Sequence, residues 1–455
     1  MRRRDVLALP FARPPRPNIV CILVDDLRFD ELACTGHPFI QSPHCDRLAR
    51  EGAAFTNAFA TTPLCSPSRA SFLTGQYAHT HGVVDNVARD ALSHRLVTWP
   101  RVLHDSGYAT AFIGKWHMGN DESPRPGFDR WVSFRGQGQC VDPDLNIDGR
   151  VTKTSGYVTD LLTDHAVEFL ERKQANPFCL YLSHKAVHPN IQQGNDGSVN
   201  PASANDAESF IPAPRHRELY AGARIPRRAN YAKLPHGQPA LERAVTNLDG
   251  ITPDATILNR ARMLKAVDDS LGRILTTLEN SRQLDDTLVI FTSDHGYFYG
   301  EHGLGPERRL AYEEAIRIPM LVRYPKLFRP ASRPAAFTLS VDLAATALLL
   351  AGVSAPHPMH GTPLHAPKRR DAVLVEYFSD TVFPNVRQMG YRAIRTDRWK
   401  YIRYEDQKGA DEIYDLRNDP FEITNLIQDN RAPRAQLDRQ LNRLLEQTGA
   451  PSPKS

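Results

Sequence analysis

Two strongly apolar stretches, far apart in the chain, constrain its fold more than any other feature. Residues 17–24 read Pro-Asn-Ile-Val-Cys-Ile-Leu-Val, and residues 286–293 read Asp-Thr-Leu-Val-Ile-Phe-Thr-Ser. Neither stretch alternates between apolar and polar residues, so each predicts a strand that is covered on both faces. Strands of this kind are typical of parallel sheets with helices on either side. The sequence therefore predicts an α/β protein with a mostly parallel central sheet.

Side chains that can bind metal follow both stretches. Asp25 and Asp26 come directly after the first, and Asp294 and His295 come after the second. Ligands of open α/β sheets bind at the carboxyl ends of the strands, so the two pairs are expected to converge. Adjacent aspartates repel each other unless a cation or proton separates them, and Ca²⁺ or Mg²⁺ accepts carboxylate oxygens. Taken alone, an Asp-Asp pair after a strand also fits a helix cap or a solvated turn.

A short segment between these stretches combines a cysteine, an arginine and the start of a helix. The segment 64–75 reads Leu-Cys-Ser-Pro-Ser-Arg-Ala-Ser-Phe-Leu-Thr-Gly. Its proline favours a turn, and Ser66 or Ser68 is predicted to cap a helix that the final glycine ends. Cys65 would then lie at the positive end of a helix dipole, where thiolates and oxyanions are favoured. Arg69 can point back at it, although a buried cysteine before an ordinary helix fits this local pattern too.

This segment resembles the signature of the type I sulfatases, Cys-x-Pro-Ser-Arg followed by Leu-Thr-Gly at the matching offset. In that family a formylglycine-generating enzyme oxidises the cysteine to Cα-formylglycine, whose hydrated aldehyde is the nucleophile. The resemblance covers nearly the whole chain from Pro17 on, and it implies that Cys65 is modified. It also implies an alkaline-phosphatase-like large domain and a bound Ca²⁺, with Mg²⁺ as the alternative. The implied metal ligands are Asp25, Asp26, Asp294, His295 and the modified residue 65.

Two further segments match the family pattern. Lys115 and His117 belong to a Gly-Lys-Trp-His segment after a strand predicted over 108–113, and in extended chain they would share one face. A lysine can neutralise a sulfate oxygen, and a histidine can exchange protons near neutral pH. After a strand predicted over 178–182, the resemblance singles out His188 as the acid that protonates the leaving alcohol. Taken singly, each of these side chains also fits a structural role.

The reaction that the resemblance implies has two stages. The hydrate at position 65, activated by the metal and by Asp294, attacks sulfur while His188 protonates the departing oxygen. The sulfate then leaves when the second hydroxyl gives its proton to His117, and the aldehyde is restored. Cationic side chains hold the charge that develops on the oxygens, an electrostatic role of large catalytic effect.

One of these cationic positions departs from the family pattern. The family commonly has a lysine a few residues before a tyrosine, and here Arg308 stands at that place before Tyr312. Arginine keeps the charge and can grip two oxygens, but its fork is larger and rigid. Together with Arg69 and Lys115, Arg308 is expected to bind the sulfate, although Glu307 beside it could equally hold it in a surface ion pair.

The length of the chain and a change in its sequence pattern predict the domain organisation. A chain of 455 residues is long for a single core, which predicts one large domain and a smaller one. After a region rich in proline and histidine the chain carries short strands and a final amphipathic helix, which resembles the small domain that ends sulfatases. The predicted divisions are an N-terminal segment 1–16, a catalytic domain 17–355, a linker 356–370 and an antiparallel α+β subdomain 371–455.

Two other regions carry structural expectations. The segment 190–255 is rich in Asn, Gly, Pro and Ser, and is predicted to form a long loop along one wall of the substrate mouth. A helix is predicted over 259–279. Its Asp268 and Asp269 are interpreted as solvated side chains rather than metal ligands.

Charge and composition exclude some partners and bear on location. The formal net charge of +4 is too small for this length to indicate nucleic acid binding, and no stretch is long and apolar enough to span a membrane. The six cysteines lack the spacing of a disulfide framework, and the sequence defines no oligomeric state. The segment 1–10 resembles the start of a bacterial twin-arginine signal, interrupted by Pro10. It predicts a periplasmic or secreted protein, or a cytoplasmic one if the signal does not function.

The resemblance to the sulfatases therefore implies a sulfuric ester hydrolase that acts on a small-molecule or glycan sulfate, with carbohydrate sulfate favoured by analogy. Two alternatives stay open. One is a hydrolase of phosphate diesters or phosphonate monoesters on the same scaffold, since related enzymes share the metal cage. The other is a catalytically silent sugar-binding protein, in which Cys65 would remain an unmodified thiol.

Overall fold

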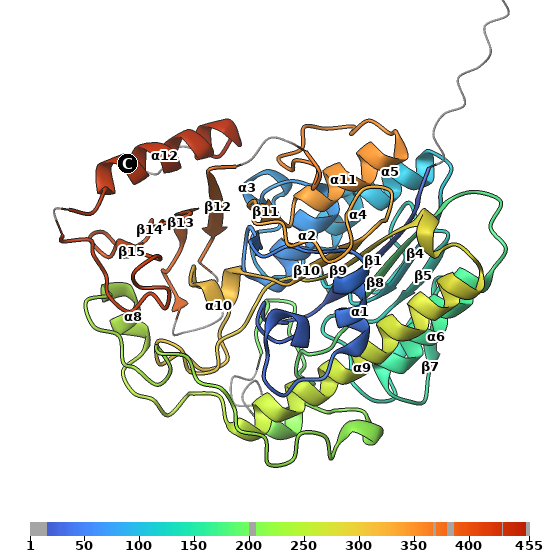
Figure 1. Ribbon diagram of the computed structural model, residues 1–455, viewed down its shortest axis with the longest axis horizontal. Coiled ribbons are helices and arrows are strands. Elements are labelled where there is room, and N and C mark those ends of the chain that lie inside the picture. The colour runs from blue at the N-terminus through green and yellow to red at the C-terminus, as the bar shows by residue number, and fades with distance from the viewer. Residues whose placement is uncertain (1–15, 200–205, 367–369, 380–385, 430, 452–455) are drawn as a thin grey trace, which may run out of the picture.

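The computed structural model describes residues 16–199, 206–366, 370–379, 386–429 and 431–451. The predicted export signal lies outside this part of the chain. One large sheet crosses most of the molecule (Figure 1). From edge to edge its strands are β2 (Ala53–Ala54), β10 (Met320–Arg323), β9 (Thr287–Ser293), β1 (Asn18–Val24), β8 (Phe178–Ser183), β4 (Ala109–Gly114), β5 (Arg130–Ser133), β6 (Asp144–Ile147) and β7 (Arg150–Lys153).

The centre of this sheet is parallel and its edges are antiparallel. Strands β9, β1, β8, β4 and β5 run in the same direction. At the edges each further strand pairs antiparallel with its neighbour: β10 with β9 and β2 with β10 on one side, and β6 with β5 and β7 with β6 on the other. The two apolar stretches form the neighbouring strands β1 and β9, whose last residues, Val24 and Ser293, are paired in register. The predicted mostly parallel sheet is therefore confirmed, and the residues after these two strands emerge at the same edge.

Strand β1 is covered on both faces, which explains its lack of alternation. One face packs against α1 (Pro43–Glu51), α6 (Val158–Glu171) and α9 (Asp254–Asn280), and the other against α2 (Cys65–Thr74), α5 (Trp99–Asp105) and α11 (Asp342–Ala351) (Figure 1). Successive side chains of a strand point to opposite faces, so each core receives alternate residues. Val20, Ile22 and Val24 lie in the first core, and Ile19, Cys21 and Leu23 lie in the second.

The helices differ from the predictions mainly at their ends and in the short pieces. Helix α9 begins at Asp254, before the predicted start. The predicted long loop contains short helices over its described part. Those of the loop are η2 (Ala207–Ser209), η3 (Pro214–His216) and α8 (Pro239–Ala244). The other short helices of the described ranges are η1 (Ala33–Thr35), α3 (Ala78–His81), α4 (Asp90–Arg95), η4 (Leu284–Asp286) and α10 (Glu313–Ile316). Among the helices in the described ranges, none combines the length and apolar character that crossing a bilayer requires.

The C-terminal part forms a separate antiparallel sheet with a helix on it, as predicted. Its strands follow chain order: β12 (Ala372–Tyr377), β13 (Tyr391–Thr396), β14 (Trp399–Tyr404) and β15 (Glu412–Asp415). Helix α12 (Arg434–Gln447) covers it with Leu437, Leu441 and Leu445. A small parallel pair, β3 (Ala58–Phe59) and β11 (Thr338–Leu339), lies in the larger part. The core of the C-terminal sheet includes Leu64, so packing there supports the start of α2.

Candidate active site

Cys65 is the first residue of α2 and is completely buried. The predicted helix caps are wrong, because Ser66 and Ser68 lie inside the first turn. Their hydroxyls bond to other segments instead: Ser66 Oγ donates to the backbone oxygen of His117, and Ser68 Oγ donates to that of Asp294 at 2.6 Å. The two serines therefore tie the start of the helix to two segments that carry other predicted site residues.

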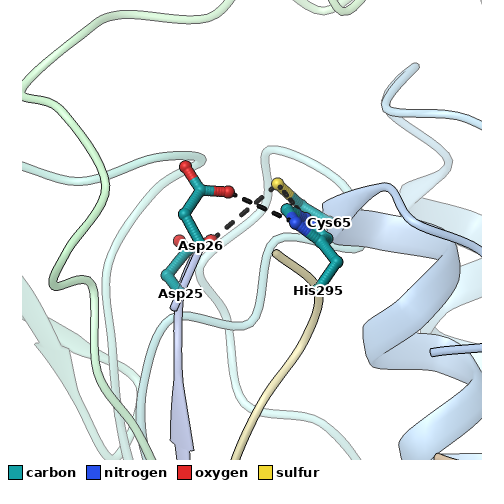
Figure 2. A group of neighbouring side chains, drawn as sticks. All are labelled: Asp25, Asp26, Cys65 and His295. Carbon is teal, nitrogen blue, oxygen red and sulfur yellow. Dashed lines mark hydrogen bonds and ion pairs between the residues drawn. The ribbon is translucent and has the colours of Figure 1, made fainter. Parts of the chain in front are cut away.

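Four buried side chains from three segments form a compact cluster at the carboxyl edge of the sheet. Their ligand atoms lie within 4.8 Å of one another, and Figure 2 shows the side chains pointing toward each other. Cys65 Sγ is 3.4 Å from His295 Nε2 and 3.9 Å from Asp25 Oδ1. The cluster consists of Asp25, Asp26, Cys65 and His295. The predicted convergence of the two strand ends is therefore observed.

Asp294 lies beside this cluster and organises its backbone. Asp294 Oδ1 accepts hydrogen bonds from the backbone N–H groups of Asp26 at 3.1 Å and His295 at 3.0 Å. Asp294 Oδ2 lies 3.8 Å from His295 Nε2. Burial raises the pKa of Asp294, and the neighbouring carboxylates act in the same direction. One oxygen thus joins the two strand ends, while the other faces the cluster.

Two buried cationic side chains, Arg69 and Lys115, form ion pairs with the carboxylates of Asp25 and Asp294. Arg69 Nη2 lies 2.9 Å from Asp294 Oδ2 and 3.4 Å from Asp25 Oδ2, and Lys115 Nζ pairs with the same oxygen of Asp25. Arg69 Nη1 also donates to Ser183 Oγ at 2.6 Å. Burial opposes the ionisation of Asp25, but Lys115 and Arg69 hold its pKa well below the usual range. Asp25 is therefore a carboxylate, and Arg69 points back toward the site as the sequence suggested.

Arg308 also points into the site. Its side chain is nearly buried, and Nη1 lies 3.1 Å from Asp26 Oδ2 while Nη2 lies 3.5 Å from His188 Nε2. Glu307 instead pairs with Arg309 at 3.0 Å, so the alternative of a surface ion pair for Arg308 is wrong. The two ends of the guanidinium fork contact different groups, in the rigid planar geometry that distinguishes an arginine from a lysine.

The cluster fits a hard divalent cation. Asp26 Oδ1 and Asp294 Oδ2 are buried and accept no well-aligned hydrogen bond from the described residues. Arg69 Nη2 lies 2.9 Å from Asp294 Oδ2, so the ion pair compensates only part of the cost of burying these carboxylates. His295 Nδ1 donates to the backbone oxygen of Gly296 at 3.0 Å, which leaves Nε2 as the ligand atom. Burial alone would lower the pKa of His295, but the acidic groups around the ring, Asp294 first, raise it to about 9. A proton therefore occupies this position until a cation replaces it. Carboxylate oxygens are the ligands that Ca²⁺ and Mg²⁺ prefer.

The segment after β4 brings Lys115 and His117 to the site by a different route from the predicted one. The backbone does not stay extended: His117 has a φ of 57°, in the left-handed region. Both side chains are buried, with Lys115 directed at Asp25 and His117 Nε2 at 2.6 Å from Gln193 Oε1. The two residues therefore reach the site through a turn. The prediction that they share one face of an extended segment is wrong.

His188 lies in the segment after β8 and is completely buried. His188 Nδ1 donates to the backbone oxygen of Pro189 at 2.9 Å, and Nε2 faces Arg308. Because a guanidinium only donates, Nε2 accepts and the ring is neutral. Burial, with the nearby Lys115, lowers the pKa of His188 well below the usual range. A role as proton donor therefore requires that Arg308 turn toward another partner.

Sequence reasoning missed three residues that hold this site. Asn86 Oδ1 accepts from the backbone N–H of Ser66 at 3.0 Å, Gln193 bonds to His117, and Arg260 Nη2 donates to the backbone oxygen of Asp26 at 2.6 Å. Asn86 and Gln193 carry no motif that could have indicated them. Arg260 did carry a signal, because it precedes Leu264 by one turn on the apolar face of α9.

The fold and the site together define an enzyme of the α/β class with its reactive centre at the carboxyl edge of a parallel sheet. Comparison with known families narrows this class. A family model described as Sulfatase matches residues 17–353, and one described as the C-terminal part of N-sulphoglucosamine sulphohydrolase matches residues 300–450. The chain therefore belongs to the sulfatase family, and it is a sulfuric ester hydrolase.

Individual relatives extend over nearly the whole chain. An N-acetylglucosamine-6-O-sulfatase of Bacteroides thetaiotaomicron is 31% identical over 95% of this chain and 86% of its own length. A human N-acetylglucosamine-6-sulfatase is 28% identical over 90% of this chain and 81% of its own. A solved structure of a protein in complex with its substrate D-glucosamine-2-N,6-O-disulfate is 29% identical, covers 96% of this chain and 99% of its own, and superposes with a TM-score of 0.84.

Proposed function

We propose that this sulfatase removes a sulfate ester from a carbohydrate, with a Cα-formylglycine made from Cys65 as its nucleophile. The observation that carries the proposal is the place of Cys65: at the start of α2, with its sulfur 3.4 Å from His295 Nε2 and 3.9 Å from Asp25 Oδ1. Positive charge is favoured at a helix start, which suits a group that develops negative charge. The hydrated aldehyde would supply the attacking oxygen, and a formylglycine-generating enzyme would have to act before folding encloses the cysteine.

A divalent cation, Ca²⁺ with Mg²⁺ as the alternative, would be held by the strand-end residues. Bound there, the cation would offset the negative charge on the attacking oxygen and on the sulfate oxygens. The proposed ligands are Asp25, Asp26, residue 65, Asp294 and His295. The fit rests on buried carboxylate oxygens that accept no well-aligned hydrogen bond and on His295 Nε2, where the cation would take the place of a proton. Asp294 would also take part in activating the nucleophile.

The cationic side chains would bind the sulfate group. Arg69 and Lys115 are fully buried, and Arg308 is nearly so, and in this dry surrounding each charge interacts more strongly than it would in water. A sulfate oxygen that draws Arg308 away from His188 would leave His188 Nε2 free to carry a proton to the leaving alcohol. His117 would accept a proton when the sulfate departs.

The proposed substrate is a 6-O-sulfate on an N-acetylglucosamine-type sugar. This choice rests on the names of the relatives and on the sugar in the complex described above. The protein, produced together with a formylglycine-generating enzyme, should release inorganic sulfate from N-acetylglucosamine-6-sulfate, and a Cys65→Ala variant should not. Faster turnover of a phosphonate monoester or phosphate diester than of any sulfate ester would contradict the proposal. Sugar binding without any turnover would instead indicate a silent binding protein.

A further inference from the structure

Gln193 lies against His117 with every hydrogen-bonding position of its amide engaged. Its Oε1 accepts from His117 Nε2 at 2.6 Å and from Gln137 Nε2 at 2.7 Å. Its Nε2 donates to the backbone oxygens of Gly197 at 3.0 Å and Asn86 at 3.3 Å. A primary amide has two donor hydrogens and two acceptor lone pairs, so the group is fully satisfied.

These partners determine which way the amide faces. The oxygens of Gly197 and Asn86 are backbone carbonyls, which only accept, so the amide nitrogen must face them. The amide oxygen therefore faces His117, and His117 Nε2 must carry the hydrogen of that bond. The lone pair of the imidazole is then on His117 Nδ1, which is buried and has no hydrogen-bond partner among the described residues.

The turn that carries Gln193 is fixed to the start of α2. Gln193 and Val199 form a β-bridge, and the backbone N–H of Gly194 donates to the oxygen of Ser198 at 2.8 Å. Asn86, which accepts from Gln193 through its backbone oxygen, also accepts from the backbone N–H of Ser66 through its side chain. The amide is thus in contact with His117, and Asn86 links it to the residue that follows Cys65.

The surroundings keep His117 neutral. Burial lowers the pKa of His117 well below the usual range, and Lys115 and Arg69 act in the same direction, whereas Gln193 and Asp25 oppose it. Its backbone lies in the left-handed region, with a φ of 57°. A neutral imidazole with one fixed, unpartnered lone pair is suited to accept a proton.

We propose that Gln193 is a positioning residue that holds His117 as the Nε2–H tautomer and so presents Nδ1 as the proton acceptor for sulfate release. This inference rests on the proposed function. In that step His117 Nδ1 takes the proton of the free hydroxyl on residue 65. The carbon–oxygen double bond of the aldehyde forms as the bond between that carbon and the sulfate oxygen breaks, and the sulfate leaves with the electron pair.

The test combines a spectroscopic and a kinetic measurement on the full chain. ¹⁵N NMR of protein labelled in histidine reports the tautomer, and a His117→Asn variant identifies the signals of this residue. We expect the Nε2–H form in the parent and loss of that single form in Gln193→Met, which keeps the length of the side chain without its amide. The kcat of Gln193→Met should fall by about 10- to 100-fold with little change in KM. Gln192→Met, at the exposed neighbouring position, should match the parent in both measurements.

Finding the Nδ1–H form of His117 in the parent protein would overturn the inference. This outcome needs no variant, so the test remains valid even if Gln193→Met fails to fold. An unchanged tautomer and an unchanged kcat in Gln193→Met would overturn it as well. Failure of the proposed function has a different signature: no sulfate release by the parent, while the tautomer of His117 still changes in Gln193→Met. In that outcome the contact stands and its catalytic role is wrong.

Discussion

The structure holds two clusters of acidic and histidine side chains with similar spacing and different character. One is the strand-end cluster of Asp25, Asp26, Cys65 and His295. The other, the helix cluster, consists of His44, Asp268 and Asp269, whose ligand atoms also lie within 4.8 Å of one another. Geometry alone makes both of them candidates for a metal ion. The two clusters differ in how completely their carboxylate oxygens are hydrogen-bonded by the protein.

The helix cluster is already satisfied by the protein. Asp268 Oδ1 accepts from the backbone N–H groups of His44 at 3.0 Å and Cys45 at 2.9 Å, at the start of α1. Lys265 Nζ lies 3.3 Å from Asp268 Oδ2 and also pairs with Asp269. The expectation of a solvated Asp268 is wrong, because the residue is fully buried and caps another helix.

The strand-end cluster and the neighbouring Asp294 are less completely hydrogen-bonded. Asp26 Oδ1 and Asp294 Oδ2 accept no hydrogen bond from the described residues, although cations lie close by. Proximity of acidic groups is therefore a weak sign of a metal site. Buried oxygens without donors are a stronger sign, because such groups cost free energy until a cation binds them.

The largest expected effect contrasts one carboxylate from each cluster. Asp26→Asn removes a charge from the strand-end cluster and should lower kcat/KM for sulfate hydrolysis by about a thousandfold, since metal catalysis supplies several kcal/mol. Asp268→Asn keeps an oxygen for the amides of α1 and should leave kcat/KM within about twofold of the parent. Equal losses in the two variants would break the comparison. The assay is release of inorganic sulfate at saturating Ca²⁺.

A second contrast concerns the response of stability to Ca²⁺. At a concentration about 100 times its Kd, an ion that binds only the folded state adds about 2.7 kcal/mol to the free energy of unfolding. The parent and Asp268→Asn should both gain this stabilisation, measured as a rise in Tm on addition of Ca²⁺ to chelator-treated protein. Asp26→Asn should show little rise. A rise that disappears in Asp268→Asn would assign the ion to the helix cluster instead.

A third contrast concerns one cationic side chain beside each cluster: Arg308 at the strand-end cluster and Lys265 at the helix cluster. Arg308→Met should lower kcat/KM by about a hundredfold, the usual effect of losing one group that stabilises developing negative charge. Arg308→Lys should recover part of the loss, because a lysine keeps the charge without the fork. Lys265→Met, the matched change in the helix cluster, should leave kcat/KM unchanged. Comparable activity of Arg308→Met and the parent would exclude Arg308 from substrate binding.

The smallest expected effect is on stability. Asp268→Ala removes the one oxygen, Oδ1, that accepts from the backbone N–H groups of both His44 and Cys45, which should reduce the free energy of unfolding by about 1–3 kcal/mol. Denaturation in urea measures this change, with Asp269→Ala as the control because Asp269 caps no helix. Full activity of the folded Asp268→Ala protein is expected. An unchanged unfolding midpoint would show that the cap contributes nothing.

The sequence was informative where one physical constraint dominates. Strands β1 and β9 could be predicted because burial on both faces removes alternation, and their acidic ends could be placed together because parallel strands end at one edge. Gly75 could be expected to end α2, because its left-handed backbone, with a φ of 70°, suits glycine.

Other features could not be predicted, because contacts between distant segments decide them. Ser66 and Ser68 look like helix caps in isolation, yet their hydroxyls bond to carbonyls from other parts of the chain. The left-handed backbone of His117 and the contact with Gln193 also depend on tertiary structure. Asp268 had the polarity of a solvated residue, and only the position of α1 shows its role.

The central claim is that Cys65 becomes an aldehyde beside a cation held by two strand ends. Mass spectrometry of the peptide that contains position 65 tests this claim most directly, on protein produced with and without a formylglycine-generating enzyme. We predict that co-production converts the cysteine peptide to one in which the CH2–SH group of residue 65 has become an aldehyde. We also predict that sulfate release rises with the converted fraction. Full sulfate release from protein in which this peptide retains an intact thiol would contradict the account.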